Sequence, residues 1–454
     1  MVVVKLNQKN SLSMNKIHQR KIKKFLHKMD IESLAKSTKF QLRKPKKIDA
    51  FNFLLSFFLV LLKKNYSLRA WATELSLLTD KVISFQAIAK KLQIRQLNFV
   101  KTLFTKALNE YFRSNNYFSQ NTLFAGFNRV LLEDSTCIKL VQSLCNHYSG
   151  SKNQYKKSAT CRVQFSFDIK SNGIENVELT SFVKNDLTYA DNILNRIKPK
   201  DLIIRDLGYM ITGVLGKITE LKAFFISRYK IGTYIYDANT DQQINLVKQL
   251  KKLDRNKIKR FDTVVKLGSK EKVKVRIVAL KLNEKQAAKR RDHAKRSRPK
   301  STLSKEAIYL MSWNILLTNI ESESLTAEQI YELYSLRWHI EIIFKNWKSN
   351  FEIDQLIQSS RGSNPVKPEL LLYLSLSFMV LIYIPKLNHY HKIIFENHNR
   401  HLSPYKFAAF VINHLDLIFD DNQDYTLKLL LQYCCYDKRK DRKNIYEKIY
   451  GMTG

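Results

Sequence analysis

The sequence is poor in several kinds of residue, and each shortage excludes a class of protein. Only 11 glycines and 7 prolines occur among 454 residues, which excludes collagen-like and low-complexity chains. No self-similar period of the kind found in solenoid proteins is present. Because 44% of the residues are hydrophobic, the chain can bury the cores of about two to four ordinary domains. We therefore expect a folded globular protein.

Cysteines and long apolar runs are also scarce. The longest apolar run, residues 370–384, has 15 residues and falls short of the roughly 20 that a membrane-spanning helix needs, so we expect a buried helix and no membrane partner. The start, MVVVKLNQKN, lacks the apolar core of a signal peptide. The cysteines are odd in number and form no C-x-x-C pair, which argues against a disulfide framework or a zinc site and favours the cytoplasm. They are Cys137, Cys145, Cys161, Cys434 and Cys435.

Acidic residues are outnumbered: 40 Asp and Glu stand against 78 Lys and Arg, a formal net charge of +38. An excess of this size favours a polyanion partner, because each neutralised phosphate releases a condensed counterion. Nucleic acid is the first candidate. Residues 1–47 hold 14 Lys and Arg against Asp30 and Glu32, which suits either a solvated tail or a DNA-contacting arm. A second basic tail is predicted at residues 438–448.

The first third of the chain has a helical pattern. Residues 51–62 predict a buried helix, and residues 68–93 predict two helices separated near residues 79–83. The second helix of that pair begins at Ser84 and is similar to the recognition segment of a helix-turn-helix. An unremarkable helix pair is the alternative.

Two short apolar runs farther along each end in a carboxylate. Val130 to Leu132 predict a buried strand that places Glu133 and Asp134 at its C-terminal end. Residues 202–204 are a continuous apolar run typical of a central strand that is covered on both faces, and Arg205 and Asp206 follow it. An Asp in such a position is more often a turn or cap residue, which remains the alternative for each.

Other strands are predicted around these two. Residues 162–169 alternate strictly between apolar and polar, the period of a strand with one buried face, and residues 174–182 suit its partner. Basic β segments then form an insertion between residues 229 and 304. It closes with residues 286–300, where seven Lys and Arg face one Asp, so we expect a flexible loop or a DNA contact. A strand at 308–319 returns to the main sheet.

One predicted helix, from Thr326 to about Asn350, carries two stripes. Tyr334, Arg337, Glu341 and Lys348 are spaced by 3, 4 and 7 residues, which places them within a 60° stripe at about 100° per residue. An apolar stripe lies beside it and predicts a buried edge; its residues are Leu333, Ile340, Phe344, Trp347 and Phe351. An amphipathic surface helix with a Glu–Arg pair is the plainer alternative.

Together these patterns predict that Asp134, Asp206 and Glu341 converge at one end of a sheet. Three carboxylates form a hard-cation site, for Mg²⁺ or for Mn²⁺ in its place. Two ions about 3.5 to 4 Å apart can hold the attacking and leaving oxygens of a phosphoryl displacement. Arg337, Lys348, Tyr334 and the neighbouring Lys345 would then contact phosphates; Arg337 can do so through two hydrogen bonds.

These residues resemble the DDE-triad transposases of bacterial insertion sequences, specifically the insertion-sequence-4 group. The segment YSLRWHIEIIFKNWKSN contains the complete Y-x2-R-x3-E-x6-K signature of that group, at Tyr334, Arg337, Glu341 and Lys348. VLLEDST around Asp134 and LIIRDLGY around the second Asp are similar to its two Asp motifs. The resemblance covers residues 120–390.

The resemblance implies an α/β fold: a ribonuclease-H-like catalytic core with a β-rich insertion, flanked by mainly helical N- and C-terminal regions. It implies a Mg²⁺-dependent enzyme with two ions per site that cleaves double-stranded DNA at transposon ends and joins the freed 3′-OH to a target, working as a homodimer. The division it suggests is 1–120 for a basic helical end-binding region, 121–228 and 305–390 for the core, 229–304 for the insertion, and 391–454 for a helical, basic C-terminal region.

In members of the group that form a DNA hairpin, a Trp within W-x-x-L-L-T, 28 residues before the Glu, stacks on a flipped base. Trp313 has this spacing and sequence here, although a core position is an open alternative for a strand Trp. Two other functions also remain open. One is a decayed or domesticated copy that only binds DNA, and the other is a nuclease of the same fold without strand transfer.

Overall fold

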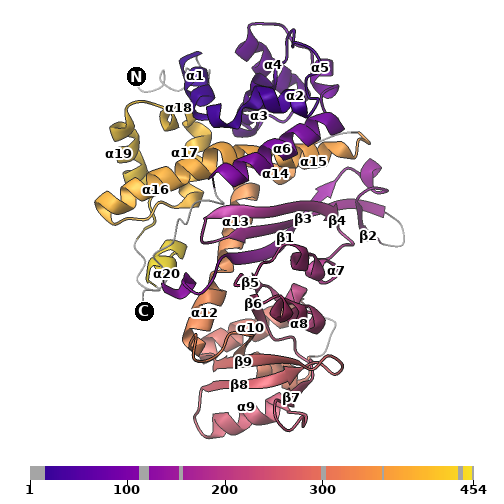
Figure 1. Ribbon diagram of the computed structural model, residues 1–454, viewed down its shortest axis with the longest axis vertical. Helices are drawn as coiled ribbons and strands as arrows, with labels where there is room; N and C mark the ends of the chain where they lie inside the picture. Colours follow the sequence, from indigo (N-terminus) through magenta and orange to yellow (C-terminus); the bar gives the residue numbers. More distant parts are fainter. Residues whose placement is uncertain are drawn as a thin grey trace.

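The computed structural model describes residues 16–111, 122–152, 157–297, 303–359, 362–437 and 443–451. Three predicted basic segments lie partly outside the described residues, which leave out the first 15 residues, residues 298–302 and residues 438–442. Figure 1 shows helices from both ends of the chain at the top, a sheet through the middle, and the strands of the insertion at the bottom.

Residues 16–111 form the N-terminal group of helices. Asp49, Ser67 and Ser84 each accept a hydrogen bond from the backbone amide three residues later, which caps three of the helices. The predicted pair within residues 68–93 is confirmed, although its second helix has only five residues. The elements are α1 Lys16–Phe25, η1 His27–Met29, α2 Ile31–Ser37, α3 Ala50–Lys63, α4 Leu68–Thr79, α5 Phe85–Ala89 and α6 Ile94–Tyr111.

The middle of the chain forms a mixed sheet. β1 pairs antiparallel with β3 and parallel with β5, β5 pairs parallel with β6, and β4 pairs with β3. Asp134 is therefore on the first strand of this core, and Asp206 follows the fourth strand if the short β2 is left aside, an order that agrees with the ribonuclease-H-like core that the resemblance implies. The strands are β1 Val130–Leu140, β2 Ser149–Lys152, β3 Lys157–Asp168, β4 Gly173–Ser181, β5 Leu202–Arg205 and β6 Phe224–Arg228.

Two details of these strands differ from the prediction. β1 does not end near Asp134, because its pairing with β3 continues to Leu140 after its pairing with β5 has stopped. β3 is buried on both faces along its second half, where Gln164 accepts a hydrogen bond from the Tyr209 hydroxyl. The alternation of polar and apolar residues predicted only one buried face. The side chains that bury the other face come from residues distant in the sequence, so the alternation could not reveal them.

Short helices connect the strands. They are η2 Thr122–Phe124, η3 Gln142–Leu144, α7 Asp186–Tyr189, η4 Ala190–Asn195, η5 Leu207–Tyr209 and α8 Thr212–Glu220. Ile193 of η4 and Val214 of α8 pack with Leu131 and Ile203 on one face of the sheet. Leu132 and Ile204 belong to the other face, where the later helices pack.

The insertion is β-rich as predicted, and its strands extend the same sheet in the order β6-β10-β9-β8-β7. The basic run at 286–300 was predicted as a loop, but its described part is helical. Its Glu, Gln, Ala, Lys and Arg residues favour a helix, and Arg290 anchors it to the Trp313 carbonyl. The predicted strand 308–319 is instead a short helix followed by a strand. The elements are β7 Ile235–Asp237, α9 Leu246–Arg255, β8 Arg260–Leu267, β9 Val273–Lys281, α10 Glu284–Ser297, α11 Lys305–Leu310 and β10 Trp313–Thr318.

The described residues after position 366 are mostly helical, as predicted. The helix over Val366–His398 is long and apolar enough to cross a membrane, but 83% of its most apolar 18-residue window is buried inside the protein. The predicted buried helix at 370–384 is thus confirmed. The elements are α12 Ala327–Ser335, α13 Trp338–Ser349, α14 Ile353–Gln358, α15 Val366–Phe378, η6 Met379–Tyr383, α16 Ile384–His398, α17 Pro404–Asn413, α18 Leu415–Ile418, α19 Gln423–Tyr433 and α20 Ile445–Gly451.

Candidate active site

The three predicted carboxylates surround one guanidinium. Arg337 Nη2 donates to Glu341 Oε1 at 2.7 Å, and Arg337 Nη1 lies 3.6 Å from Asp134 Oδ2. Arg337 Nε lies 3.9 Å from Asp206 Oδ1. Each carboxylate thus faces a different nitrogen of the same side chain. Residues more than 200 positions apart in the sequence are brought to one place.

The sheet and α13 produce this arrangement. Successive side chains of a strand point to opposite faces, so Asp134 lies on the face of Leu132, which packs in the same core cluster as Ile340 and Phe344 of α13. β5 runs parallel to β1 and ends at Arg205, level with Glu133, so Asp206 emerges beside Asp134. Figure 1 shows α12 and α13 in orange, crossing beside these strands.

The predicted helix 326–350 is interrupted where Arg337 stands. The amides of Leu336, Arg337, His339 and Ile340 each bond to the carbonyl three residues earlier, instead of four, so the helix tightens for one turn between α12 and α13. A 3₁₀ stretch within a helix often marks a functional hinge. The predicted apolar stripe is buried, which confirms the prediction that this edge of the helix packs against a core.

Burial controls the electrostatics of the site. It raises the pKa of Asp134 to about 6, although the Ser135 amide and Arg337 act in the opposite direction. Burial lowers the pKa of Arg337, but Asp206, Tyr334 and Glu341 outweigh it and raise that pKa above its ordinary value. The Asp134 side chain is 19% exposed and that of Asp206 42%. A bound cation would therefore offset a larger desolvation cost at Asp134 than at Asp206.

The other signature residues lie at different depths. Burial and the charge of Asp206 raise the pKa of Tyr334 to about 12, and its hydroxyl is buried without a well-formed hydrogen bond. Lys348 is exposed on α13. Lys345 is also exposed, but its ammonium lies 5.0 Å from the centre of the Tyr405 ring, on the side of α17. The structure therefore brings Tyr334 to the carboxylates and directs Lys345 elsewhere.

Trp313 occupies a core position, so the base-stacking prediction is not supported. It is 1% exposed and packs in the second hydrophobic cluster, with its indole N–H 3.4 Å from the Tyr309 hydroxyl. The Lys281 ammonium lies 5.6 Å from its ring centre. A nucleobase has no access to the indole face while β10 keeps this packing. The W-x-x-L-L-T spacing matches the family motif, but spacing alone does not report burial.

A polar cluster beside Asp134 was missed by the sequence reasoning. Ser135 Oγ donates to Asp186 Oδ1 at 2.6 Å, and Arg162 Nη1 donates to both, at 2.8 and 3.0 Å. A Cβ at Gly208 would lie 3.0 Å from Asp186 Oδ2, so the glycine lets this carboxylate approach the loop after Asp206. Only the adjacency of Ser135 to Asp134 hinted at the cluster.

Two further residues at the site had a weak signal in the sequence. Trp338, inside the signature segment, is 54% exposed, and the Arg337 guanidinium lies 5.5 Å from its ring centre. Arg228 ends β6, and its charge acts to lower the pKa of Tyr334. The local sequence around Trp338 and Arg228 does not mark either residue as part of the site. Each belongs to the site because of its distance from Arg337, which only the folded structure shows.

The donor set suits a divalent cation, with one obstacle. Carboxylate oxygens are the ligands that Mg²⁺ and Mn²⁺ prefer. Among the described residues, however, no three His, Cys, Asp or Glu side chains are grouped closely enough to hold a metal ion. Arg337 occupies the centre instead, and its Nε is buried without a well-formed hydrogen bond. A cation would therefore take the place of a guanidinium that is only partly satisfied there.

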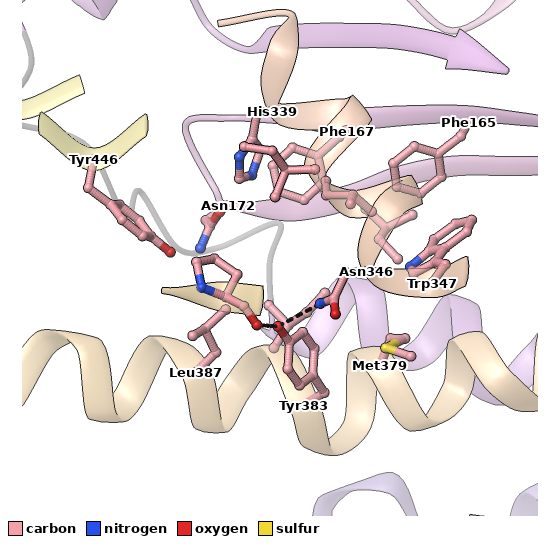
Figure 2. Close-up of a pocket in the computed structure, with 15 residues that line it drawn as sticks. Phe165, Phe167, Asn172, His339, Asn346, Trp347, Met379, Tyr383, Leu387 and Tyr446 are labelled. Atoms are coloured by element: carbon pink, nitrogen blue, oxygen red, sulfur yellow. Dashed lines mark hydrogen bonds between the residues drawn. The ribbon is translucent and has the colours of Figure 1, made fainter. Parts of the chain in front are cut away.

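A small cavity of about 50 Å³ lies among β3, α13, α16 and α17 (Figure 2). Apolar side chains line most of it, and the Asn346 amide donates to the Tyr383 hydroxyl along its wall. His339 is buried here, and burial lowers its pKa to about 4. The cavity is too apolar and too small to receive DNA, so we place the site at the carboxylates.

The fold and the carboxylate cluster define a DDE transposase. Residues 125–377 match the family described as the transposase DDE domain, and the chain belongs to this family. Such a domain implies divalent metal ions. The family predicted from the signature is thus confirmed, and the protein is an enzyme with transposase activity.

The relatives are transposases of insertion sequences. The transposase for insertion sequence element IS1151 of Clostridium perfringens is 30% identical over 347 residues, which are 72% of each chain. The transposase for IS231F of Bacillus thuringiensis subsp. israelensis is 26% identical over 404 residues, covering 84% of this chain and 83% of the relative. The structure of a piggyBac transposase synaptic complex with hairpin DNA aligns with 94% of this chain and 86% of its own. Its TM-score of 0.34 and 10% identity are too low to establish a shared fold.

Proposed function

We propose that this transposase cleaves and joins DNA with Asp134, Asp206 and Glu341 as the ligands of two Mg²⁺ ions, for which Mn²⁺ can substitute. The observation that carries the proposal is the convergence of these three carboxylates on Arg337. Three anionic side chains gathered in a protein of net charge +38 are costly unless a cation compensates them. Arg337 supplies that compensation in the protein alone.

Arg337 has two alternative partners in this mechanism. A metal ion that binds the carboxylates would displace the guanidinium, which can then turn to a DNA phosphate and form two parallel hydrogen bonds with it. The buried Tyr334 hydroxyl, without a well-formed hydrogen bond, can donate to the same phosphate. Exposed Lys348, and Lys345 more remotely, supply positive charge along the DNA path. Bound metal ions would activate the attacking water or 3′-OH and stabilise the leaving oxygen.

The partners in this proposal are double-stranded DNA and a second copy of the chain. The basic helices of residues 16–111, with the basic segment before them, would bind the terminal inverted repeats. Two transposon ends must be brought together before joining, so we propose a homodimer in the complex with DNA. DNA as the substrate places the enzyme in the cytoplasm, at the nucleoid.

The test is a reaction of the wild type and Asp134→Ala with a labelled element-end duplex, Mg²⁺ and a target plasmid. We expect nicking and joining that require the metal and are absent in the variant. End binding with no metal-dependent cleavage would refute the proposal and favour a copy that only binds DNA. Cleavage without joining of a pre-cut 3′-OH end would instead indicate a nuclease of the same fold.

A further inference from the structure

A buried ion pair stands directly behind the two aspartates. Glu133 and Arg205 form the last residue pair between β1 and β5, and each immediately precedes its aspartate in the chain. Glu133 Oε2 lies 2.7 Å from Arg205 Nη2, and both side chains are at least 96% buried. Arg196 Nη2 donates to the other oxygen of Glu133 at 2.8 Å.

This pair lies on the opposite face of the sheet from the site. Because strand side chains alternate, Glu133 shares the face of Leu131, and Arg205 that of Ile203. Arg205 Nη1 donates to the Ala190 carbonyl of η4 on that face. Neither side chain of the pair therefore reaches the DNA, so any effect on the reaction passes through the strands.

The same two strands carry a second, partly buried ion pair at their other end. Arg129, just before β1, donates through Nε at 3.1 Å and through Nη2 to the two oxygens of Asp201, just before β5. Glu133 lies four positions after Arg129, roughly 13 Å along the strand. The paired segment of β1 and β5 is thus bracketed by ion pairs.

The two ion pairs differ in how completely their polar atoms are hydrogen-bonded. Arg129 and Asp201 form an aligned, two-bond contact. Glu133 Oε2 and Arg205 Nε and Nη2 are close together, yet all three are buried without a well-formed hydrogen bond. A buried ion pair is weak support for stability, since apolar residues of similar volume often serve as well. An imperfect pair at this place points to a positional role.

We propose that Glu133 and Arg205, with Arg196, are positioning residues that fix the register of β1 against β5 where their pairing ends, and so set the separation of Asp134 and Asp206 for metal binding. The inference rests on the proposed function of the two aspartates. A strand end that shifts by a fraction of its residue spacing moves its aspartate by the same distance. Metal ligands depend on supports of this kind, and loss of one typically costs about 10- to 100-fold in metal affinity.

The test compares Glu133→Gln with Asp201→Asn, the matched change at the far end of the same strands. Mn²⁺ binding to the full-length protein is measured from the electron paramagnetic resonance of free Mn²⁺, and the Mg²⁺ concentration for half-maximal cleavage is measured separately. We expect the Mn²⁺ dissociation constant and the half-maximal Mg²⁺ concentration both to rise about 10- to 100-fold in Glu133→Gln. In Asp201→Asn we expect both to stay at the wild-type values. Thermal unfolding shows the temperature at which both variants remain folded.

Other outcomes separate the explanations. Equal metal affinity in both variants, with lower thermal stability in each, would overturn the proposal and make the pair structural. If Glu133→Gln does not fold, Arg196→Gln removes the partner that is 23% exposed, and an unchanged Mn²⁺ affinity in that variant would equally overturn the proposal. Mn²⁺ binding that Asp134→Ala abolishes and Glu133→Gln weakens, in a protein that cleaves no DNA, would retain the positioning role and refute the proposed function. A wild type that binds no Mn²⁺ would refute both.

Discussion

Replacing Asp134 by Asn should make the metal-free protein more stable while it removes cleavage. Burial raises the pKa of this carboxyl from its ordinary 3.8 to about 6, which means that the folded protein holds the ionised form at a cost. The amide of Asn is nearly the same size and carries no charge. We therefore expect the variant to unfold at a higher temperature above pH 6.

The structure gives the size of this effect. The two pKa values differ by about 2, and at about 1.36 kcal/mol for each pH unit the cost of ionisation is on the order of 3 kcal/mol. The folded pKa is raised, so the cost is fully present above pH 6, falls as the pH drops from 6 to 3.8, and is absent below that range. The increase in the free energy of unfolding caused by Asp134→Asn should depend on pH in the same way.

The assay is thermal unfolding of the wild type and the variant in chelator, from pH 4 to pH 8. Asp206→Asn is the control, because the Asp206 side chain is 42% exposed and should gain less. Added Mn²⁺ should stabilise the wild type and leave Asp134→Asn unchanged, since only the wild type retains the ligand. A lower unfolding temperature for Asp134→Asn at pH 8 would refute the reasoning and mean that Arg337 already compensates the charge.

Three more outcomes can be measured directly. Glu341→Gln should abolish cleavage and keep end binding, which a gel-shift assay would follow; parallel loss of both would mean that Glu341 is structural. DNA affinity should fall about 10³-fold or more over a fourfold rise in salt if six or more phosphates are neutralised, and a flat response would exclude phosphate-dominated binding. Trp313→Ala should destabilise the protein by about 3 to 5 kcal/mol in urea unfolding, as for a large core side chain, and an undiminished stability would contradict its core position.

Local patterns predicted most of the secondary structure and failed where a distant segment intervened. The runs around Leu131 and Ile203 became adjacent parallel strands, and the helix carrying Glu341 packs by its predicted apolar edge. β1 ran past Asp134 because β3 continues to pair with it, and the helix tightened at Arg337 where it meets the carboxylates. Pairing partners and buried charges of this kind are not encoded in a short window of sequence.

The sequence by itself determined the family, because the spacing of Tyr334, Arg337, Glu341 and Lys348 is a property of one local segment. It also determined the excess of positive charge and the apolar runs that become the core. Only the tertiary structure decided that Arg337 lies among the three carboxylates, that Trp313 is enclosed, and that Glu133 and Arg205 meet behind the site. These contacts join residues far apart in the chain, and their energies depend on burial and on distances of a few ångströms, which exist only once the chain has folded.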